Sequence, residues 1–172
     1  GAEIAMEDMR LPADALLGEA GHAFPAIERA NARAVAAQTA EALGLMERIK
    51  DLTADYLQQR TQFDKPLIKF QALAFRMADV LIEIEQARSA VINLCGHLDA
   101  DRETRELHVS ATKQLVGETA KLVVEESIQM HGGIGITQEY DLAHFARRLT
   151  MVEHRFGDAL FHLGRFSRLR MA

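Results

Sequence analysis

Residues 67–98 read LIKFQALAFRMADVLIEIEQARSAVINLCGHL, a stretch with no proline and a single glycine near its end. Apolar side chains recur in it at alternating steps of three and four residues, which is the spacing of one helix face. The stretch therefore predicts an amphipathic helix, roughly 45–50 Å long at about 1.5 Å per residue. The predicted inward face consists of Phe70, Leu73, Met77, Leu81, Ile84, Ala87, Val91 and Leu94.

The sequence on both sides of this stretch predicts further long helices. Before it, a helix is expected from about Pro25, a favoured first helical residue, to about Gln59. After it, the chain reverses and a helix follows over about 104–130, with Asp101 or Thr104 as its N-cap. The first of these helices carries an apolar stripe of Leu45, Ile49, Leu52 and Tyr56. The second is expected to turn Leu107, Ala111, Leu115, Leu122 and Ile128 inward.

Two shorter helices are predicted near the C-terminus, over about 139–148 and 156–170. Helices joined by short loops pack as antiparallel neighbours. The expected fold class is therefore all-α, an antiparallel up-down four-helix bundle whose fourth helix is broken, with a short N-terminal extended arm.

Residues 1–22 differ from the rest of the chain. Residues 2–11 read as a short strand or arm, and residues 11–21 form a loop punctuated by proline and glycine. A strand this isolated cannot hold itself, because a sheet needs partners. Two readings stay open, an arm packed on the bundle and the end of a preceding β-domain, and we favour the second. The chain then divides into an arm and loop over 1–22 and a bundle over 23–172.

The composition excludes several classes of protein. Apolar residues make up 48% and charged residues 26% of the 172 residues, the balance of a globular chain. The net charge of −5 argues against a dedicated nucleic-acid binder, whose footprint is basic. No apolar run is long enough to predict a membrane span. The single cysteine, Cys95, excludes an internal disulfide and is expected to be a small core residue of a cytoplasmic protein.

Residues 129–137, QMHGGIGIT, form the most specific local feature. Glycine permits positive φ and lets another group approach the backbone closely. A glycine C-cap with a tight helix-to-helix turn would need only one of Gly132, Gly133 and Gly135. Three glycines together, preceded by Gln129, indicate that a ligand lies against this backbone. Both readings stay open from the residues alone.

Residues 60–71, RTQFDKPLIKFQ, are a second candidate site. Arg60 falls at a predicted helix end, where a guanidinium stabilises the last carbonyls or clamps a phosphate through two hydrogen bonds. Phe63 and Phe70 are either core residues or walls against a flat ring.

Taken together, RTQF (60–63), PLIKFQ (66–71), MAD (77–79) and QMHGGIGIT (129–137) resemble the acyl-CoA dehydrogenase family in order and spacing. The resemblance extends from the loop at residue 11 to about Arg148. It implies that the chain is the last strand of a middle β-domain followed by the C-terminal four-helix bundle. It also implies the cofactor FAD, which this family binds between domains and across a subunit interface.

The resemblance assigns cofactor contacts to individual residues. Arg60 and Gln62 would meet the pyrophosphate side of FAD, and Phe63, Phe70 and Gln71 would lie near the cofactor. Gln129, Gly132 and Gly133 would take the adenosine end of an FAD bound mainly to a neighbouring subunit. No metal ligand is expected.

The family reaction removes the α-proton of an acyl-CoA thioester while a hydride leaves the β-carbon for flavin N5. A carboxylate base in a dry pocket is needed, because burial raises its pKa toward the working pH. The two base positions used in the family fall on Phe156 and Ala34, and neither side chain accepts a proton. Glu153 and Glu28 lie near these positions and are the candidate substitutes.

The resemblance therefore implies two functions. One is the C-terminal domain of an FAD-dependent acyl-CoA dehydrogenase, with an acyl-CoA substrate and electron-transfer flavoprotein or a similar acceptor as partners. The other is a catalytically degenerate partner subunit that completes the FAD site of a sister chain. Phe156 and Ala34 favour the second for this chain's own site. A homo- or hetero-oligomer is expected in both cases.

Overall fold

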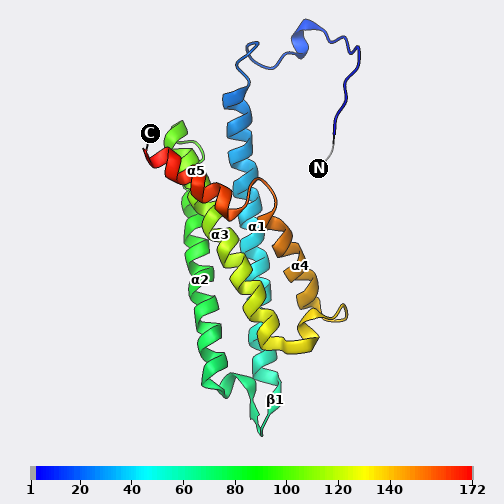
Figure 1. Cartoon of the computed structure of the whole chain (residues 1–172), viewed down its shortest axis with the longest axis vertical. Helices are drawn as coiled ribbons and strands as arrows, with labels where there is room; N and C mark the ends of the chain where they lie inside the picture. The colour runs from blue at the N-terminus through cyan, green and yellow to red at the C-terminus, as the bar shows by residue number, and fades with distance from the viewer. Residues whose placement is uncertain (1–2, 172) are drawn as a thin grey trace.

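The computed structural model of the protein describes residues 3–171. This part of the chain is dominated by five α-helices, with one small antiparallel hairpin between the first two (Figure 1). The helices are α1 (Phe24–Gln59), α2 (Gln71–Gly96), α3 (Arg102–His131), α4 (Asp141–Glu153) and α5 (Ala159–Met171). The hairpin strands are β1 (Thr61–Gln62) and β2 (Lys65–Pro66), and short 3₁₀ helices are η1 (Ala13–Ala15), η2 (Leu67–Lys69) and η3 (Gly132–Ile136).

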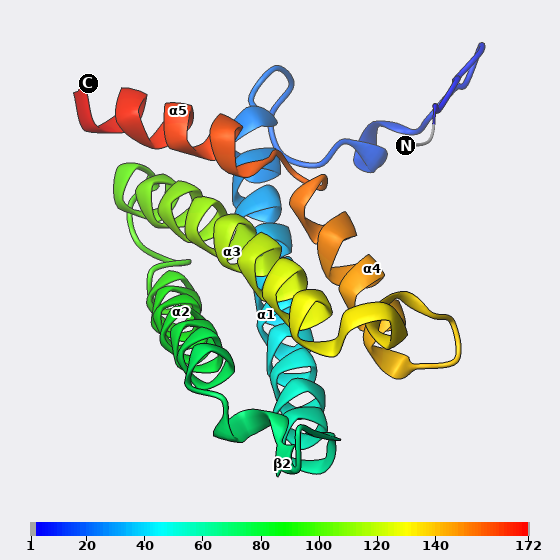
Figure 2. The same ribbon diagram turned by 60° about the horizontal axis from the view of Figure 1, so that its bottom comes forward.

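The first four helices run alternately down and up the long axis, as the sequence predicts, and α5 departs from this pattern (Figures 1 and 2). It lies across the upper part of the bundle, where it packs mainly on α3. The chain turns sharply between α4 and α5, because Phe156 and Gly157 both adopt positive φ, 58° and 95°. The all-α class is thus confirmed, with α4 as the fourth column and α5 as a crossing helix.

Among the helix ends, the start of α3 shows side-chain capping. Asp101 is the N-cap of α3, as expected, and its Oδ1 accepts a hydrogen bond from the Thr104 amide at 3.0 Å. Helix α2 begins later than predicted, at Gln71, because residues 65–66 pair with 61–62 in the hairpin and residues 67–69 form η2. Helix α4 continues to Glu153, five residues beyond its predicted end.

The core lies between α1, α2, α3 and α4. Most of the predicted α2 face is buried, but Leu81 is exposed and Val80 is buried in its place. The predicted inward face of α3 is rotated: its five predicted residues are half-buried, and neighbouring positions are covered completely. Because α3 contacts all four other helices, its burial does not follow a single apolar stripe. The fully covered α3 residues include Val109, Lys113, Val116 and Val123.

The prediction that Cys95 is a core residue is wrong, because its side chain is exposed. Cys95 follows the buried Leu94, and one helical step of about 100° carries it away from the bundle. None of the described helices combines the length and the apolarity that a membrane crossing requires.

The segment before α1 extends away from the bundle (Figure 1). Among its apolar side chains, Ile4 is 80% exposed and Leu17 is 91% exposed. The described residues 3–22 are therefore not packed on the helices. That this arm is the end of a β-domain stays a prediction.

Candidate functional site

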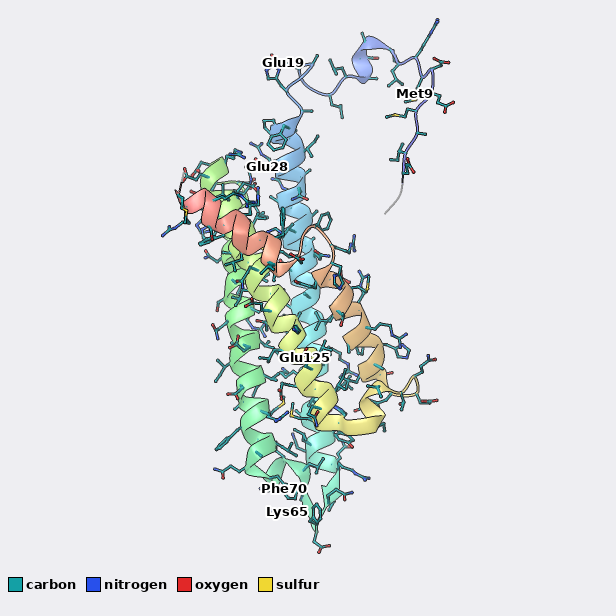
Figure 3. The ribbon with its side chains drawn as sticks, in the orientation of Figure 1. Met9, Glu19, Glu28, Lys65, Phe70 and Glu125 are labelled. Atoms are coloured by element: carbon teal, nitrogen blue, oxygen red, sulfur yellow. The ribbon has the colours of Figure 1, made fainter. Side chains whose placement is uncertain are left out.

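The residues singled out in the sequence gather at two opposite ends of the bundle. At the hairpin end, the β1–β2 hairpin forms the lowest point of Figure 1, and the α3–α4 turn lies above it, where the end of α3 contacts the last turn of α1. At the α5 end, the first turns of α1 meet α5 and the turn of residues 154–158. Figure 3 shows Lys65 and Phe70 at the hairpin end and Glu28 near α5, so the two groups are separated by most of the bundle.

An aromatic contact joins the last turn of α1 to the segment of residues 129–137. The Tyr56 ring, in the last turn of α1, stacks on His131 at the end of α3 with 4.4 Å between ring centroids. The Tyr56 hydroxyl also donates to the His131 carbonyl oxygen at 3.2 Å. His131 Nδ1 lies 2.8 Å from the carbonyl oxygen of Ser127, and burial lowers the pKa of this imidazole despite that hydrogen bond. His131 is thus a core residue that fixes the glycine turn relative to α1.

The three glycines of the turn differ in what surrounds them. Gly132 has φ 68° and ψ −146°, a conformation that is essentially reserved for glycine. Gly135 is buried, and a Cβ there would lie 3.0 Å from His131 Cβ and 3.3 Å from Leu142 Cδ2. Gly133 shows neither feature: its φ is not positive, and a Cβ would meet no atom within 4 Å. The described chain gives no packing reason for glycine at 133, and this backbone is open to an external group.

Arg60 caps the C-terminus of α1 with its backbone and leaves its side chain exposed. Its amide donates to the Tyr56 carbonyl at 2.9 Å, and its carbonyl accepts from the Leu67 amide at 2.9 Å. No ion pair of the Arg60 guanidinium occurs within residues 3–171. Gln62, Gln71 and Gln129 are also exposed at this end. The side chains that could hold a phosphate or a nucleotide therefore point outward.

The two phenylalanines of the hairpin form a small aromatic surface. Phe63 is 85% exposed, and its φ of 51° places it at the tip of the hairpin. Its ring lies edge-on to the half-buried Phe70 ring, with 6.2 Å between centroids. The Lys65 ammonium lies 4.2 Å from the centroid of the Phe70 ring. Phe63 is therefore exposed to solvent, where it could contact a ligand ring, whereas Phe70 is half-buried and packs against its neighbours.

The α5 end contains an open pocket of about 460 Å³. Phe156, 41% exposed, contributes one wall from the α4–α5 turn, and Phe24 and Ile27 contribute another from the first turns of α1. The pocket lining is therefore largely apolar, with a few polar residues. Its lining residues are Phe24, Ile27, Glu28, Asn31, Phe156, Gly157, Phe161, His162 and Arg165.

Glu28 borders this pocket, but its carboxylate is already engaged. It accepts hydrogen bonds from Arg102 Nε at 2.7 Å and Arg102 Nη2 at 2.8 Å, and from Arg165 Nη2 at 3.3 Å. Its side chain is only 7% exposed. Arg105 Nη2 lies 3.5 Å from Glu28 Oε2 as well. A carboxylate surrounded by three guanidinium groups acts as a structural anion in this conformation. Ala34 is half-buried further along α1 and does not line the pocket.

Glu153, the second candidate base, borders a different surface groove of about 290 Å³ between α3 and α4. Its Oε1 accepts a hydrogen bond from the Ala159 amide at 2.7 Å, at the start of α5. Its Oε2 is buried and lies 3.9 Å from the Lys113 ammonium. The structure thus brings Phe156 and Glu28 to one pocket and leaves Glu153 outside it.

A family model described as acyl-CoA dehydrogenase, C-terminal domain, matches residues 24–159. The match runs from the first residue of α1 to the first residue of α5 and covers most of the chain. The chain belongs to the acyl-CoA dehydrogenase family. FAD is the cofactor of this family.

Individual acyl-CoA dehydrogenases agree with this assignment. The chain is 32% identical over 146 residues to the short-chain specific acyl-CoA dehydrogenase of Megasphaera elsdenii, a match covering 84% of this chain and 38% of that protein. The structure of butyryl-CoA dehydrogenase from Megasphaera elsdenii is similar with a TM-score of 0.88 and 29% identity, over 96% of this chain and 43% of that one. The ChsE4-ChsE5 complex from Mycobacterium tuberculosis gives a TM-score of 0.78 and 26% identity, over 82% and 38%. The chain therefore spans about two fifths of the length of these relatives.

Sequence reasoning misses a buried ionic cluster at the α5 end of this acyl-CoA dehydrogenase domain. Arg105 Nε donates to Glu106 Oε1 at 2.7 Å, and Arg165 Nη2 donates to Glu106 Oε2 at 2.7 Å. Together with Glu28 and Arg102, these groups tie α1, α3 and α5 together. The sequence does contain a sign that one further residue, Lys113, is buried. It lies on the same helical stripe as Val109, Val116 and Ala120 of α3. A lysine on an apolar stripe indicates a buried cation with a specific partner.

Proposed function

We propose that this chain is the C-terminal domain of an FAD-dependent acyl-CoA dehydrogenase, an enzyme that removes hydrogens from the α and β carbons of an acyl-CoA thioester. The observation that carries the proposal is the hairpin end, where Arg60 is exposed at the end of α1 and the backbone of Gly133 is open to solvent. The proposal includes a cytoplasmic location and an electron-transferring flavoprotein or similar acceptor as partner.

The hairpin end has the chemistry needed to hold the nucleotide part of FAD. The exposed Arg60 guanidinium can donate two parallel hydrogen bonds to a phosphate. Gly132 and Gly133 leave their backbone accessible, so an adenosine or phosphate group can approach it. Phe63 adds an exposed ring beside this surface. When bound, FAD supplies the hydride acceptor at flavin N5.

The pocket at the α5 end suits an apolar acyl chain. Phe24, Ile27 and Phe156 give it apolar walls, and such walls exclude water from a reacting thioester. In the described conformation, its one bordering carboxylate, Glu28, is paired with Arg102 and Arg165. The pocket can bind and orient an acyl group, whereas proton abstraction needs a base from elsewhere.

This absence of an available base favours a second candidate function, a partner subunit that completes the FAD site of a sister chain. The ChsE4-ChsE5 structure is a complex of two differently named proteins. A hetero-oligomer of this kind would let one chain supply nucleotide contacts while the other supplies the base. The residues of the hairpin end support both candidates equally.

The nucleotide role is tested by Arg60→Ala in the full-length protein assembled with its FAD. Loss of a charge-assisted pair of hydrogen bonds predicts about tenfold to hundredfold weaker FAD binding. Arg33→Ala is the matched control, because Arg33 pairs with Asp99 on the surface of the other end. Equal FAD retention in both variants, measured by flavin absorbance after dialysis, would contradict the assignment of Arg60 as a phosphate contact of FAD.

The two candidate functions are separated by an acyl-CoA oxidation assay with an artificial electron acceptor. The partner reading predicts FAD retention without turnover by the chain alone, turnover on adding a second subunit, and new turnover in Phe156→Glu. Robust turnover by the chain alone, abolished by Glu28→Gln or Glu153→Gln, contradicts the partner reading.

A further inference from the structure

Lys113 is the most deeply buried cation in the described part of the chain. Its side chain is 0% exposed, in the middle of α3. The ammonium donates to the carbonyl oxygen of Val152 at 3.2 Å and to that of Glu153 at 3.3 Å. These carbonyls belong to the last two residues of α4, where a helix has no hydrogen-bond donors of its own and carries partial negative charge. Lys113 thus caps α4 from a neighbouring helix.

The Glu153 carboxylate extends this contact to the start of α5. Its Oε2 lies 3.9 Å from the Lys113 ammonium, and its Oε1 accepts the Ala159 amide at 2.7 Å. Oε2 is buried and has no hydrogen-bond partner among the described residues. Burial lowers the pKa of the Lys113 ammonium, while Glu153 and Asp158 act in the opposite direction. The carboxylate therefore depends on Lys113 as its counter-ion.

Gly117 of α3 makes room for this arrangement. It lies four residues after Lys113, so the two positions share one face of the helix. A Cβ at this position would overlap the Glu153 carboxylate. A side chain of any other residue would displace Glu153 from the place where it reaches both Lys113 and Ala159.

The lysine and glutamate hold the two ends of a strained turn. Between Glu153 and Ala159, Phe156 has φ 58°, which is uncommon for a residue with a Cβ. On the other side, His162 Nε2 lies 2.9 Å from the Phe156 carbonyl oxygen. A Cβ at Gly157 would lie 2.5 Å from Phe161 Cδ1 and 3.1 Å from His162 Nε2, so this close contact needs glycine. The surroundings, rather than local preference, determine where Phe156 points.

We propose that Lys113 and Glu153 are the positioning pair of the α4–α5 turn, and that they set how Phe156 lines the acyl pocket. The assignment of the pocket to an acyl group rests on the proposed function, whereas the positioning of the turn does not. The pair acts through the turn and does not itself line the pocket.

The test compares three variants of the full-length protein assembled with its FAD. Lys113→Met removes the ammonium and keeps an apolar stem, and Gly117→Ala displaces the carboxylate while leaving Lys113 in place. Lys121→Met is the matched control, because Lys121 is exposed on the same helix and, among residues 3–171, pairs only with Glu125. Hydrogen exchange followed by mass spectrometry reports the turn (154–162) and the distant hairpin (61–70) separately.

Lys113→Met and Gly117→Ala are expected to speed exchange in the turn at least about tenfold and to leave the hairpin and the FAD content unchanged. The same variants are expected to weaken binding of S-alkyl-CoA thioethers about tenfold by calorimetry. These probes resemble an acyl-CoA but have no carbonyl and cannot be oxidised at the α and β carbons in the same way. Lys121→Met is expected to match the wild-type protein in every measurement.

Unchanged exchange in the turn of Lys113→Met overturns the positioning role. Faster exchange together with unchanged thioether binding overturns the acyl pocket and leaves the positioning of the turn intact. If Lys113→Met does not fold, Glu153→Gln replaces it, because the amide keeps an acceptor for the Ala159 amide but removes the charge. Wild-type exchange in that variant also overturns the proposal.

Discussion

Alanine substitutions at the three glycines of the glycine turn distinguish glycines required for packing from a glycine required for ligand contact. Gly132→Ala forces a side chain into a backbone conformation suited only to glycine, at a cost of about 1–3 kcal/mol. Gly135→Ala places a methyl group 3.0 Å from His131 Cβ, and such overpacking costs about 1–3 kcal/mol. Gly133→Ala meets open space, so its effect on stability is expected to stay within about 0.5 kcal/mol.

Thermal unfolding of the full-length protein checks the stability half of this prediction. A change of 1 kcal/mol moves the melting temperature of a 150–250-residue domain by about 2–4 °C, and that of a longer cooperative unit by less. Gly132→Ala and Gly135→Ala are therefore expected to melt several degrees below the wild-type protein. Gly133→Ala is expected to melt at the same temperature as the wild-type protein. FAD titration checks the other half: Gly133→Ala is expected to bind FAD about tenfold more weakly, because the added methyl group stands where the nucleotide approaches.

Two results would refute the reasoning about the turn. If Gly133→Ala melts as low as Gly135→Ala, then position 133 is closed by packing and its glycine has a structural cause. If Gly133→Ala keeps both its stability and its FAD affinity, the open backbone is not a cofactor contact. Gly135→Ala is the internal control for overpacking, since its predicted loss does not depend on FAD.

Two further predictions concern stability. Burial lowers the folded-state pKa of His131 and of His162 below the ordinary value of 6.5. The unfolded chain therefore binds more protons than the folded chain below this pH. The free energy of unfolding is thus expected to decrease as pH falls from about 6.5. Urea unfolding at a series of pH values checks this, and His131→Phe is expected to reduce the slope. Asp101→Ala removes the N-cap bond to the Thr104 amide and is expected to cost about 1 kcal/mol in urea unfolding. Asp99→Ala, which removes an exposed ion pair with Arg33, is expected to change stability by less than half as much.

The local features of the chain were predictable because their causes lie within a few residues. Apolar spacing predicted a helix over residues 67–98, and α2 is observed over Gln71–Gly96. The later start, which was not predicted, results from the hairpin pairing of residues 61–62 with 65–66 and from η2. The N-cap Asp101 and the sharp end of α3 at Gly132 likewise depend on neighbouring residues. The prediction of two separate candidate segments at 60–71 and 129–137 also came from local composition.

The candidate bases show where such reasoning ends. Glu28 and Glu153 are equally plausible substitutes in the sequence, since each lies near a position that the family uses. The structure assigns Glu28 to an ion-paired cluster beside the pocket and Glu153 to a contact with Lys113 and Ala159. Arg165 reaches Glu28 across 137 positions of sequence, and no periodicity predicts that pair.

The sequence by itself determined the helical class, the long helices with their caps and the glycine-rich turn, because backbone preferences and apolar spacing act locally. Only the tertiary structure decided which face of α3 is buried, where α5 lies, and that the hairpin and the glycine turn share one end of the bundle. It also decided that Lys113 is a buried cap of α4. These features depend on which helices meet, and the energy of a buried charge depends on the partner that packing brings within reach.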